Sequence, residues 1–296
     1  MSRIPAYLGV ARAPFLLLPV TLIAAGGAAG FYEGHFSTAR TVLALVGLVA
    51  LHVAVNVLNE VSDMRTGVDL HTRRTPFSGG SGTLPAGQLT PRAARAFGLL
   101  AALLGLLIGA WFYTRVGWPI LPLMTVGGFA VICYTDALAR IGIGEVFAGL
   151  GLGLLPVWGA ALVQGGRPGA TALAASLPAF FMTFNLLLLN EFPDETADRI
   201  GKRRHLVIVL GRRAAALVYA LAALAAPAAI VIAVGVRALP PYCLAATLPS
   251  LLLAKPLRWA LTTPESEVPV PALGANVVWN LATNALLAIT LAASRL

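Results

Sequence analysis

Two short clusters of acidic residues repeat one pattern within an otherwise apolar chain. The first is Asn59-Glu60-Val61-Ser62-Asp63, followed by Asp69, and the second is Asn190-Glu191-Phe192-Pro193-Asp194, followed by Glu195 and Asp198. Both read Asn-Glu-x-x-Asp, they start 131 residues apart, and each closes a long apolar run. Carboxylates are costly at a membrane boundary, so a repeated cluster there indicates a functional site. Two facing clusters of this kind suit hard divalent cations, which in turn bind phosphate.

The spacing within each cluster predicts where its side chains point. Asn190, Asp194 and Asp198 are four residues apart, so on a helix they lie along one face. Asn59 and Asp63 share this spacing. Either cluster alone would also fit a solvated helix end. Two clusters at equivalent places favour one shared site with oxygen ligands from both.

Composition identifies the kind of protein that must position these clusters. The chain has 296 residues, of which 58% are hydrophobic and 11% are charged, whereas a soluble domain carries about 25% charged residues. We therefore expect an all-α integral membrane protein in which a single transmembrane domain spans residues 1–296. The net charge of +9 fits loops that set topology and meet lipid headgroups. The basic residues form no patch outside such loops, so we do not expect nucleic-acid binding.

Nine apolar segments are candidate membrane spans, for which about 20 residues are typical, although the eighth is short and contains three prolines. They are Ala13–Gly30, Thr41–Leu58, Ala96–Phe112, Trp118–Tyr134, Val146–Val163, Thr171–Leu189, Ala214–Val234, Leu239–Leu253 and Ala272–Ala293. With a cytoplasmic N-terminus, 16 Lys and Arg residues fall on the cytoplasmic side and five on the other, as the positive-inside rule requires. Both acidic clusters then lie on the cytoplasmic face. Their repetition predicts two pseudo-repeated halves around a central cavity.

Basic side chains flank both clusters. Arg65 follows the first cluster, Lys202 and Arg203 follow the second, and Arg12 precedes the first span. We expect them to contact phosphate oxygens that a bound cation does not coordinate. Membrane topology alone would also account for basic residues in these loops.

A glycine-rich stretch lies in the long loop after the first cluster. It reads Thr75-Pro76-Phe77-Ser78-Gly79-Gly80-Ser81-Gly82, which is turn chemistry that allows close backbone approach. An ordered cover over the clusters and a flexible linker both fit this composition. Its place beside the first cluster favours the cover.

The motifs resemble those of a known family. The pattern Asn59-Glu60-x-x-Asp63-x-x-x-Gly67-x-Asp69 resembles the first aspartate-rich motif of the UbiA-type intramembrane prenyltransferases, and residues 190–203 resemble the second. Tyr134-Thr135, Gly142-Ile143-Gly144-Glu145 and Gly151-Leu152-Gly153 resemble the central region of that family. Glu60 departs from it, because Asp is more common there. Gly67-Val68-Asp69 is similar to the branch that prenylates 1,4-dihydroxy-2-naphthoate for menaquinone, and the Ser78–Gly82 stretch fits that branch less well.

The resemblance implies a reaction and a set of roles. Members transfer a polyprenyl group from polyprenyl diphosphate to an aromatic quinone precursor, with Mg²⁺ as cofactor and diphosphate as leaving group. The implied metal ligands are Asn59, Asp63, Asp194 and Asp198. The implied catalytic residues are Asp63, Asp69, Asp194, Asp198 and Tyr134, and the implied diphosphate contacts are Asn59, Arg12, Arg65, Lys202 and Arg203. Glu60, Glu191 and Asp136 stay open between catalysis and structure, as do the acceptor, the chain length and the oligomeric state.

Two other functions remain open at this stage. One is a metal-coupled transporter, which repeated halves with intramembrane acids would suit, although the acids here lie at the cytoplasmic ends of the spans. The other is a related intramembrane enzyme, such as a prenyl-diphosphate cyclase or a prenyltransferase with another acceptor. We expect an enzyme in the lipid bilayer of a prokaryotic inner or plasma membrane, with an active site that opens to the cytoplasmic side.

Overall fold

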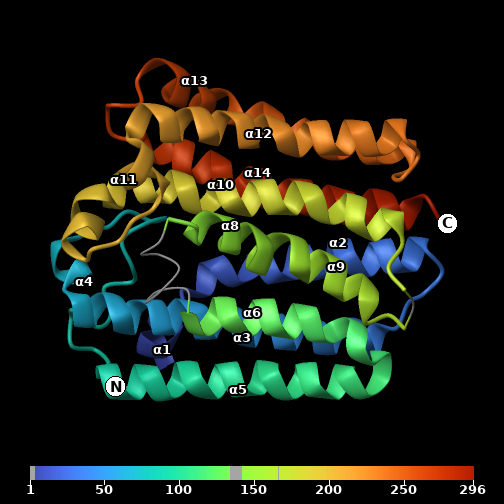
Figure 1. Ribbon diagram of the computed structural model, residues 1–296, viewed down its shortest axis with the longest axis horizontal. Coiled ribbons are helices and arrows are strands. Elements are labelled where there is room, and N and C mark those ends of the chain that lie inside the picture. The colour runs from blue at the N-terminus through green and yellow to red at the C-terminus, as the bar shows by residue number, and fades with distance from the viewer. Residues whose placement is uncertain (1–3, 134–141, 166) are drawn as a thin grey trace.

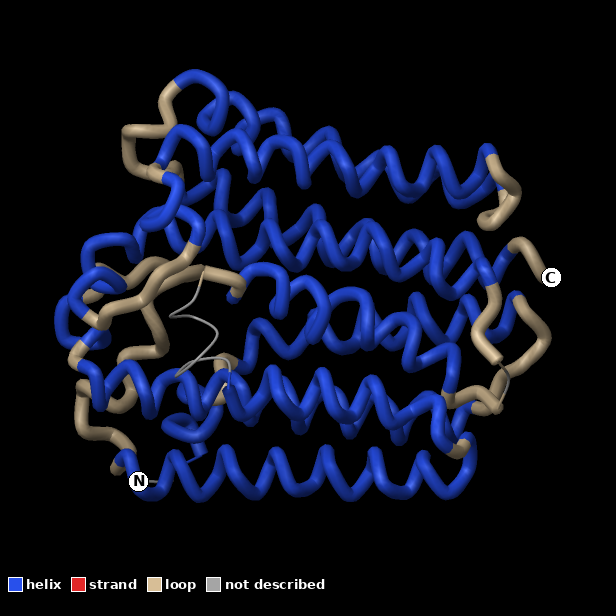
Figure 2. The backbone as a smooth tube through the Cα atoms, in the orientation of Figure 1, coloured by secondary structure: helices blue, strands red, loops and turns tan. Residues whose placement is uncertain are grey.

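Helices form all the regular structure in the computed structural model, which describes residues 4–133, 142–165 and 167–296. In chain order the elements are α1 (Ile4–Val10), η1 (Ala13–Leu16), α2 (Leu17–Tyr32), α3 (Thr38–Thr66), α4 (Val68–His71), α5 (Pro91–Val116), η2 (Trp118–Ile120), α6 (Leu121–Cys133), α8 (Gly144–Gly149), the π-helical turn η4 (Leu150–Leu154), α9 (Leu155–Leu162), α10 (Ala170–Ile200), α11 (Leu206–Leu210), α12 (Arg212–Gly235), η5 (Pro241–Leu253), α13 (Ala254–Thr262) and α14 (Val270–Ala293). The long helices lie side by side along one axis (Figures 1 and 2).

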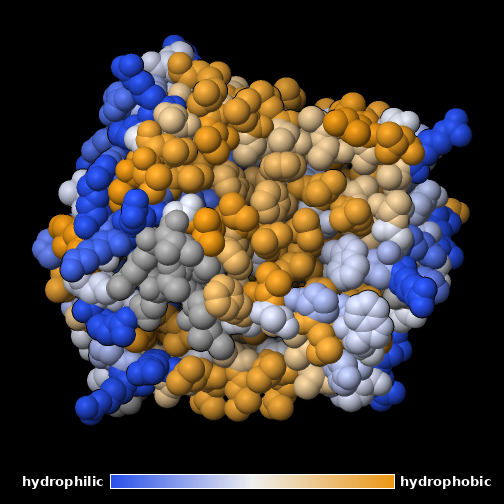
Figure 3. Space-filling model, viewed as in Figure 1, coloured by the Kyte–Doolittle hydropathy of each residue, from blue (hydrophilic) through white to orange (hydrophobic). Residues whose placement is uncertain are grey.

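Seven helical segments in the described ranges are long and apolar enough to cross a membrane. They coincide with seven of the nine predicted spans. The predicted span at Trp118 corresponds to a shorter apolar helix, Trp118–Val131, and the one at Leu239 corresponds to the 3₁₀ helix η5. On the face shown in Figure 3, apolar residues cover most of the middle of the bundle, and hydrophilic ones gather at its two ends. The all-helical membrane architecture is confirmed, and nine crossings stay a prediction.

The ends of α3 follow from local sequence. The Ser37 side chain accepts a hydrogen bond from the Arg40 backbone N–H and so caps the first turn. The helix ends at Gly67, which has a φ of +80°, a conformation that glycine adopts without strain. The chain turns there, and Asp69 therefore lies beyond the end of α3, on α4.

The central segment from α8 to α9 is broken within the bundle and packs directly on α10. Leu152 has non-helical angles, with φ −122° and ψ 29°. Its carbonyl oxygen accepts a hydrogen bond of 2.7 Å from the Thr183 hydroxyl on α10, which satisfies a group that the break exposes. A Cβ at Gly149 or Gly153 would overlap the α10 backbone. Small residues thus allow the close approach that membrane helices need.

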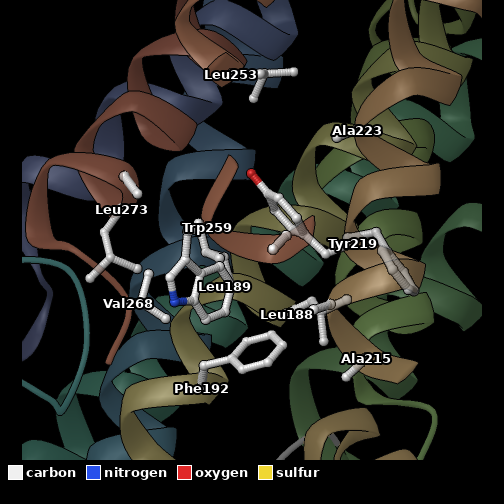
Figure 4. Close-up of a cluster of buried hydrophobic side chains, with 14 of the residues drawn as sticks. Leu188, Leu189, Phe192, Ala215, Tyr219, Ala223, Leu253, Trp259, Val268 and Leu273 are labelled. Atoms are coloured by element: carbon white, nitrogen blue, oxygen red, sulfur yellow. The ribbon is translucent and has the colours of Figure 1, made fainter. Parts of the chain in front are cut away.

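A buried aromatic cluster anchors the acidic end of α10 (Figure 4). The rings of Phe192 on α10 and Trp259 on α13 meet edge to face, with their centroids 4.9 Å apart. Tyr219 on α12 donates a hydrogen bond of 3.1 Å to the Asn276 side chain on α14. The first contact joins the C-terminal turns of α10, which carry the second acidic cluster, to α13, and the second joins α12 to α14.

Two adjacent glycines on α2 give a test of this packing. A Cβ at Gly26 would overlap the carbonyl oxygen of Val157 on α9, whereas a Cβ at Gly27 would meet Thr41 at an ordinary 3.6 Å. We expect Gly26→Ala to lower the free energy of unfolding by about 1–3 kcal/mol and Gly27→Ala to change it little. Thermal unfolding in detergent measures both. Equal effects at the two positions would contradict the close contact between α2 and α9.

Candidate functional site

The acidic ends of α3 and α10 meet at one end of the bundle, beside α4 and α11 (Figure 1). Between them lies a polar cavity of about 110 Å³. Its polar lining residues are Arg12, Asn59, Asp63, Asp69, Thr72, Ser78, Asn190, Glu191, Asp194, Asp198, Arg203 and His205. The two clusters, far apart in sequence, thus contribute to one site.

Arg203 joins the two clusters directly. Its guanidinium donates to Asp198 Oδ1 at 3.0 Å, to Asn59 Oδ1 at 3.2 Å and, in a shorter contact, to Asp63 Oδ1. Asp63 and Asp198 are both buried, so this cation offsets the cost of bringing two carboxylates together in a poorly solvated place. A metal cation bound to the same carboxylates would occupy the position that the Arg203 guanidinium holds here.

The glycine-rich loop covers this cavity with backbone. The Gly79 N–H donates a hydrogen bond of 3.2 Å to Asp194 Oδ2. Gly80 has a φ of +73°, and a Cβ there would lie 2.8 Å from Asp69 Oδ1. Only glycine allows this approach without strain. The loop is therefore an ordered cover over both clusters, as its position favoured.

Glu60 faces the loop and does not line the cavity. Its Oε1 accepts from the Ser81 N–H at 2.7 Å and from the Arg12 Nε at 3.1 Å, and its Oε2 accepts from the Ser81 hydroxyl at 2.6 Å. The side chain is fully buried. Glu60 therefore anchors the covering loop and orients Arg12, which reaches the cavity wall. The sequence pattern left the role of Glu60 open between catalysis and structure, and these contacts favour a structural role.

Three carboxylate oxygens of residues that line the cavity accept no hydrogen bond from the part of the chain that the structure describes. They are Asp69 Oδ2, Glu191 Oε2 and Asp194 Oδ1, and all three are buried. Burial, followed by repulsion from Asp63 and Glu60, raises the pKa of Asp69 to about 7. Unpartnered carboxylate oxygens beside further carboxylates and the amide of Asn59 are a donor set that suits a hard divalent cation such as Mg²⁺. The residues present therefore fit that cofactor.

A second group of titratable side chains includes two residues that line the polar cavity, Glu191 and His205. Glu145 on α8, Glu191 on α10 and His205 have ligand atoms within 4.8 Å of one another, and all three are buried. Glu145 Oε1 accepts a hydrogen bond of 2.6 Å from the Leu206 backbone N–H. The central segment thereby holds the chain that carries His205 and Arg203. The sequence interpretation missed His205, whose only signal was its position directly after the basic run.

Some predicted site residues lie elsewhere. Arg65 and Lys202 are exposed and do not line the cavity. Lys202 has a φ of +58° and occupies the left-handed position that ends α10, while the Arg203 N–H bonds back to the Asp198 carbonyl. Its backbone therefore turns Arg203 toward the site. Tyr134 and Asp136 lie outside the described residues.

An apolar cavity of about 220 Å³ adjoins the polar one. Arg12, Asn59, Phe77, Leu187 and Asn190 line both. His52 and Asn56 on α3, expected on the same helix face as Asn59, also line the apolar cavity. The site therefore combines a charged compartment with an adjacent apolar chamber that carries a few polar groups, an arrangement that suits a ligand with an anionic head and an apolar body.

Comparisons with known proteins identify a family and a fold. The model of the UbiA prenyltransferase family matches residues 17–291. The chain is 27% identical over 218 residues to a protein named 1,4-dihydroxy-2-naphthoate octaprenyltransferase from Escherichia coli (strain K12), covering 71% of this chain and 70% of that protein.

Two solved structures share the fold. A UbiA homolog from Aeropyrum pernix K1 superposes with a TM-score of 0.71 at 17% identity, covering 96% of this chain and 98% of the other. A UbiA homolog from Archaeoglobus fulgidus, bound to DMAPP and Mg²⁺, superposes with a TM-score of 0.63 at 16% identity, covering 97% and 99%.

Proposed function

We propose a reaction for this chain from the premise that it belongs to the UbiA prenyltransferase family and is a prenyltransferase. It transfers a polyprenyl group from polyprenyl diphosphate to an aromatic quinone precursor and releases diphosphate. The observation that carries this proposal is the convergence of both acidic clusters on one polar cavity that adjoins an apolar chamber. The named E. coli relative favours 1,4-dihydroxy-2-naphthoate as acceptor.

The polar cavity binds the diphosphate end of the donor. Asp63, Asp194 and Asp198, with Asn59 as a neutral oxygen ligand, hold Mg²⁺, which when bound neutralises the charge of the leaving diphosphate. Two observations support this assignment: the unpartnered oxygen of Asp194, and the DMAPP and Mg²⁺ bound to the Archaeoglobus homolog. Asp69 completes the acidic set from α4.

Arg12 and Arg203 act on the diphosphate from two sides. Arg12 lines both cavities, which supports a contact between its guanidinium and a diphosphate bound at their boundary. Arg203, which donates to Asp63 and Asp198, would donate to phosphate oxygens if a metal cation took its place at these carboxylates. Charge-assisted bonds of this kind stabilise the developing diphosphate anion.

The apolar chamber protects the carbocation that remains when the carbon–oxygen bond breaks. Phe77 from the covering loop and Leu187 from α10 line the boundary between the compartments and exclude water, which would otherwise capture the cation. The electron-rich acceptor ring attacks from this chamber, where His52 and Asn190 offer polar atoms to its hydroxyl groups.

A panel assay tests the function. Purified protein is supplied with Mg²⁺, a polyprenyl diphosphate and, in separate reactions, dihydroxynaphthoate, hydroxybenzoate, homogentisate or a glycerol-ether acceptor. We expect a prenylated dihydroxynaphthoate product by mass spectrometry, with matching release of diphosphate. Diphosphate release without any prenylated acceptor would favour the cyclase, and absence of both would overturn the proposal.

The same proposal includes a membrane topology. The chain forms one transmembrane domain over residues 1–296 with nine crossings, a cytoplasmic N-terminus and two pseudo-repeated halves. The ratio of 16 to five basic residues supports this arrangement, as does the similar placement of the two clusters at the ends of α3 and α10. The active site then opens to the cytoplasmic side of a prokaryotic inner or plasma membrane.

The covering loop yields a prediction with a matched control. Gly80 and Gly87 have φ values of +73° and +68°, but a Cβ would approach Asp69 only at Gly80, and at Gly87 it would meet nothing within 4 Å. Both alanine variants carry a similar backbone cost of about 1–2 kcal/mol. We expect Gly80→Ala alone to raise the Mg²⁺ concentration needed for half-maximal diphosphate release. Similar Mg²⁺ curves for the two variants would contradict a loop that shapes the metal site.

A further inference from the structure

Glu145, Glu191 and His205 form a buried group beside the polar cavity, and none of them takes part in the chemistry above. Glu145 lies on α8, Glu191 lies on α10 and His205 directly precedes α11, so three segments of the chain meet here. Each residue offers one ligand atom, and these atoms lie within 4.8 Å of one another. None of the three residues is more than 8% exposed.

The polar atoms of this group are short of partners. Glu145 Oε2, Glu191 Oε2 and both ring nitrogens of His205 are buried and form no hydrogen bond within the described part of the chain. Glu191 Oε2 lies 3.8 Å from His205 Nδ1, which is too long for a hydrogen bond. Buried polar atoms normally have partners, and a buried carboxylate without one is costly. Among the described residues, no cation contacts both glutamates.

The ligand types in the group suit a divalent transition metal better than Mg²⁺. Imidazole nitrogen is a preferred ligand of Zn²⁺ and related ions, whereas Mg²⁺ prefers oxygen. Two ligands of a tetrahedral zinc ion lie about 3.4 Å apart, since each is about 2.0–2.2 Å from the metal. The 3.8 Å between His205 Nδ1 and Glu191 Oε2 is close to that value. Both residues line the polar cavity, which gives an ion a way in and can supply a water as the fourth ligand.

Neighbouring contacts orient the three side chains as a metal site requires. Glu145 Oε1 accepts a hydrogen bond of 2.6 Å from the Leu206 backbone N–H, which leaves Oε2 for an ion. His205 Nδ1 faces Glu191, and its Nε2 lies 3.4 Å from Asp198 Oδ2. A metal-binding histidine commonly directs its second ring nitrogen to a carboxylate, which fixes the orientation of the ring. The imidazole therefore links this group to Asp198, a proposed ligand of Mg²⁺.

We propose that Glu145, Glu191 and His205 bind a divalent transition metal ion such as Zn²⁺, separate from the Mg²⁺ of the polar cavity. The ion ties α8, α10 and the start of α11 together and, through His205, positions Asp198. The site itself does not depend on the prenyl-transfer function, but its effect on Asp198 rests on that function. The alternative is a proton shared between the two glutamates, which would leave His205 Nδ1 without a partner.

Metal content tests the site directly. Protein purified without a polyhistidine tag is stripped with a chelator, equilibrated with a slight molar excess of Zn²⁺ and a large excess of Mg²⁺, and desalted before elemental analysis. We expect one zinc ion per chain, with an X-ray absorption spectrum that shows one imidazole and otherwise oxygen ligands. No retained zinc, or zinc with oxygen ligands alone, would overturn the proposal.

Matched variants locate the ion. Glu145→Gln keeps an oxygen that can accept the backbone hydrogen bond, and we expect it to weaken zinc binding by at least about 100-fold, because changes beyond the ligands already cost about 10- to 100-fold. His205→Asn should do the same. Glu267→Gln and His35→Asn are the controls, because both residues are exposed, and should keep wild-type affinity. Wild-type affinity in Glu145→Gln and His205→Asn would contradict the proposal. If His205→Asn does not fold, Glu191→Gln replaces it under the same criterion.

Diphosphate release tests the link to Asp198. The Mg²⁺ concentration for half-maximal release is measured with and without bound zinc, in the wild type and in Glu145→Gln. We expect zinc to lower that concentration about tenfold in the wild type, with kcat unchanged, and to have no effect in Glu145→Gln. Bound zinc without this difference would contradict the positioning of Asp198. A wild type that binds zinc but releases no diphosphate from any donor would overturn the prenyl-transfer function and not the zinc site.

Discussion

Replacing Asp63 with asparagine is expected to lower prenyl transfer by at least about 100-fold at saturating Mg²⁺. A metal that neutralises a leaving group supplies several kcal/mol of transition-state stabilisation, and about 1.4 kcal/mol corresponds to a tenfold change in rate. Asn preserves the shape of Asp63 but removes one charge from the set that would hold the cation. Asp194→Asn should have a similar effect from the α10 side of the cavity.

Diphosphate release as a function of Mg²⁺ concentration measures this change. Glu267→Gln is the matched control, because that side chain is 85% exposed and pairs only with the exposed Arg73 among the described contacts. We expect the control to retain wild-type turnover. Full turnover in both folded Asp63→Asn and Asp194→Asn would show that the metal lies elsewhere.

Replacing Arg203 with glutamine is expected to lower stability strongly when Mg²⁺ is absent, and less when it is present. Arg203 is the cation that partners Asp63 and Asp198, whose side chains are 7% and 4% exposed. Breaking a buried pair of this kind costs about 3–5 kcal/mol, since it leaves charge without compensation. A metal cation bound to the same carboxylates restores that compensation, and binding to the folded state alone stabilises it.

Thermal unfolding in detergent, with Mg²⁺ and with a chelator, tests this prediction. Arg199→Gln serves as control, because Arg199 is 54% exposed and pairs with Glu195 on the same helix. We expect the Mg²⁺-induced rise in unfolding temperature to be larger for Arg203→Gln than for the wild type or the control. An equal rise in all three proteins would contradict the replacement of Arg203 by a metal at these carboxylates.

The sequence predicted the helical membrane architecture because long apolar runs admit few alternatives in lipid. It also predicted that Asn59, Asp63, Asp194 and Asp198 would share a site, since helical spacing and equivalent placement determine where such side chains point. These residues do line one cavity. Their assignment as metal ligands stays a prediction.

Other features depend on tertiary contacts that no local pattern encodes. Arg65 and Lys202 were grouped with Arg12 and Arg203 because all four flank the clusters, yet the first two are exposed and lie outside the cavity. The turn after each helix sets the direction of these side chains. Lys202 adopts a left-handed backbone conformation that directs Arg203 to the cavity, while its own charged group stays exposed. Glu60 likewise accepts a hydrogen bond from Ser81, a partner that helix spacing alone does not predict.

The ion pair between Arg203 and Asp63 also bears on the order in which the protein assembles. Its two residues are 140 positions apart in the chain, and a nascent chain inserts its N-terminal part first. Until α10 and the turn after it have been synthesised, the end of α3 carries a carboxylate, Asp63, whose arginine partner does not yet exist. The two acidic clusters therefore gain their shared arginine only late in biogenesis, and a fragment truncated before α10 is expected to be less stable than the whole chain.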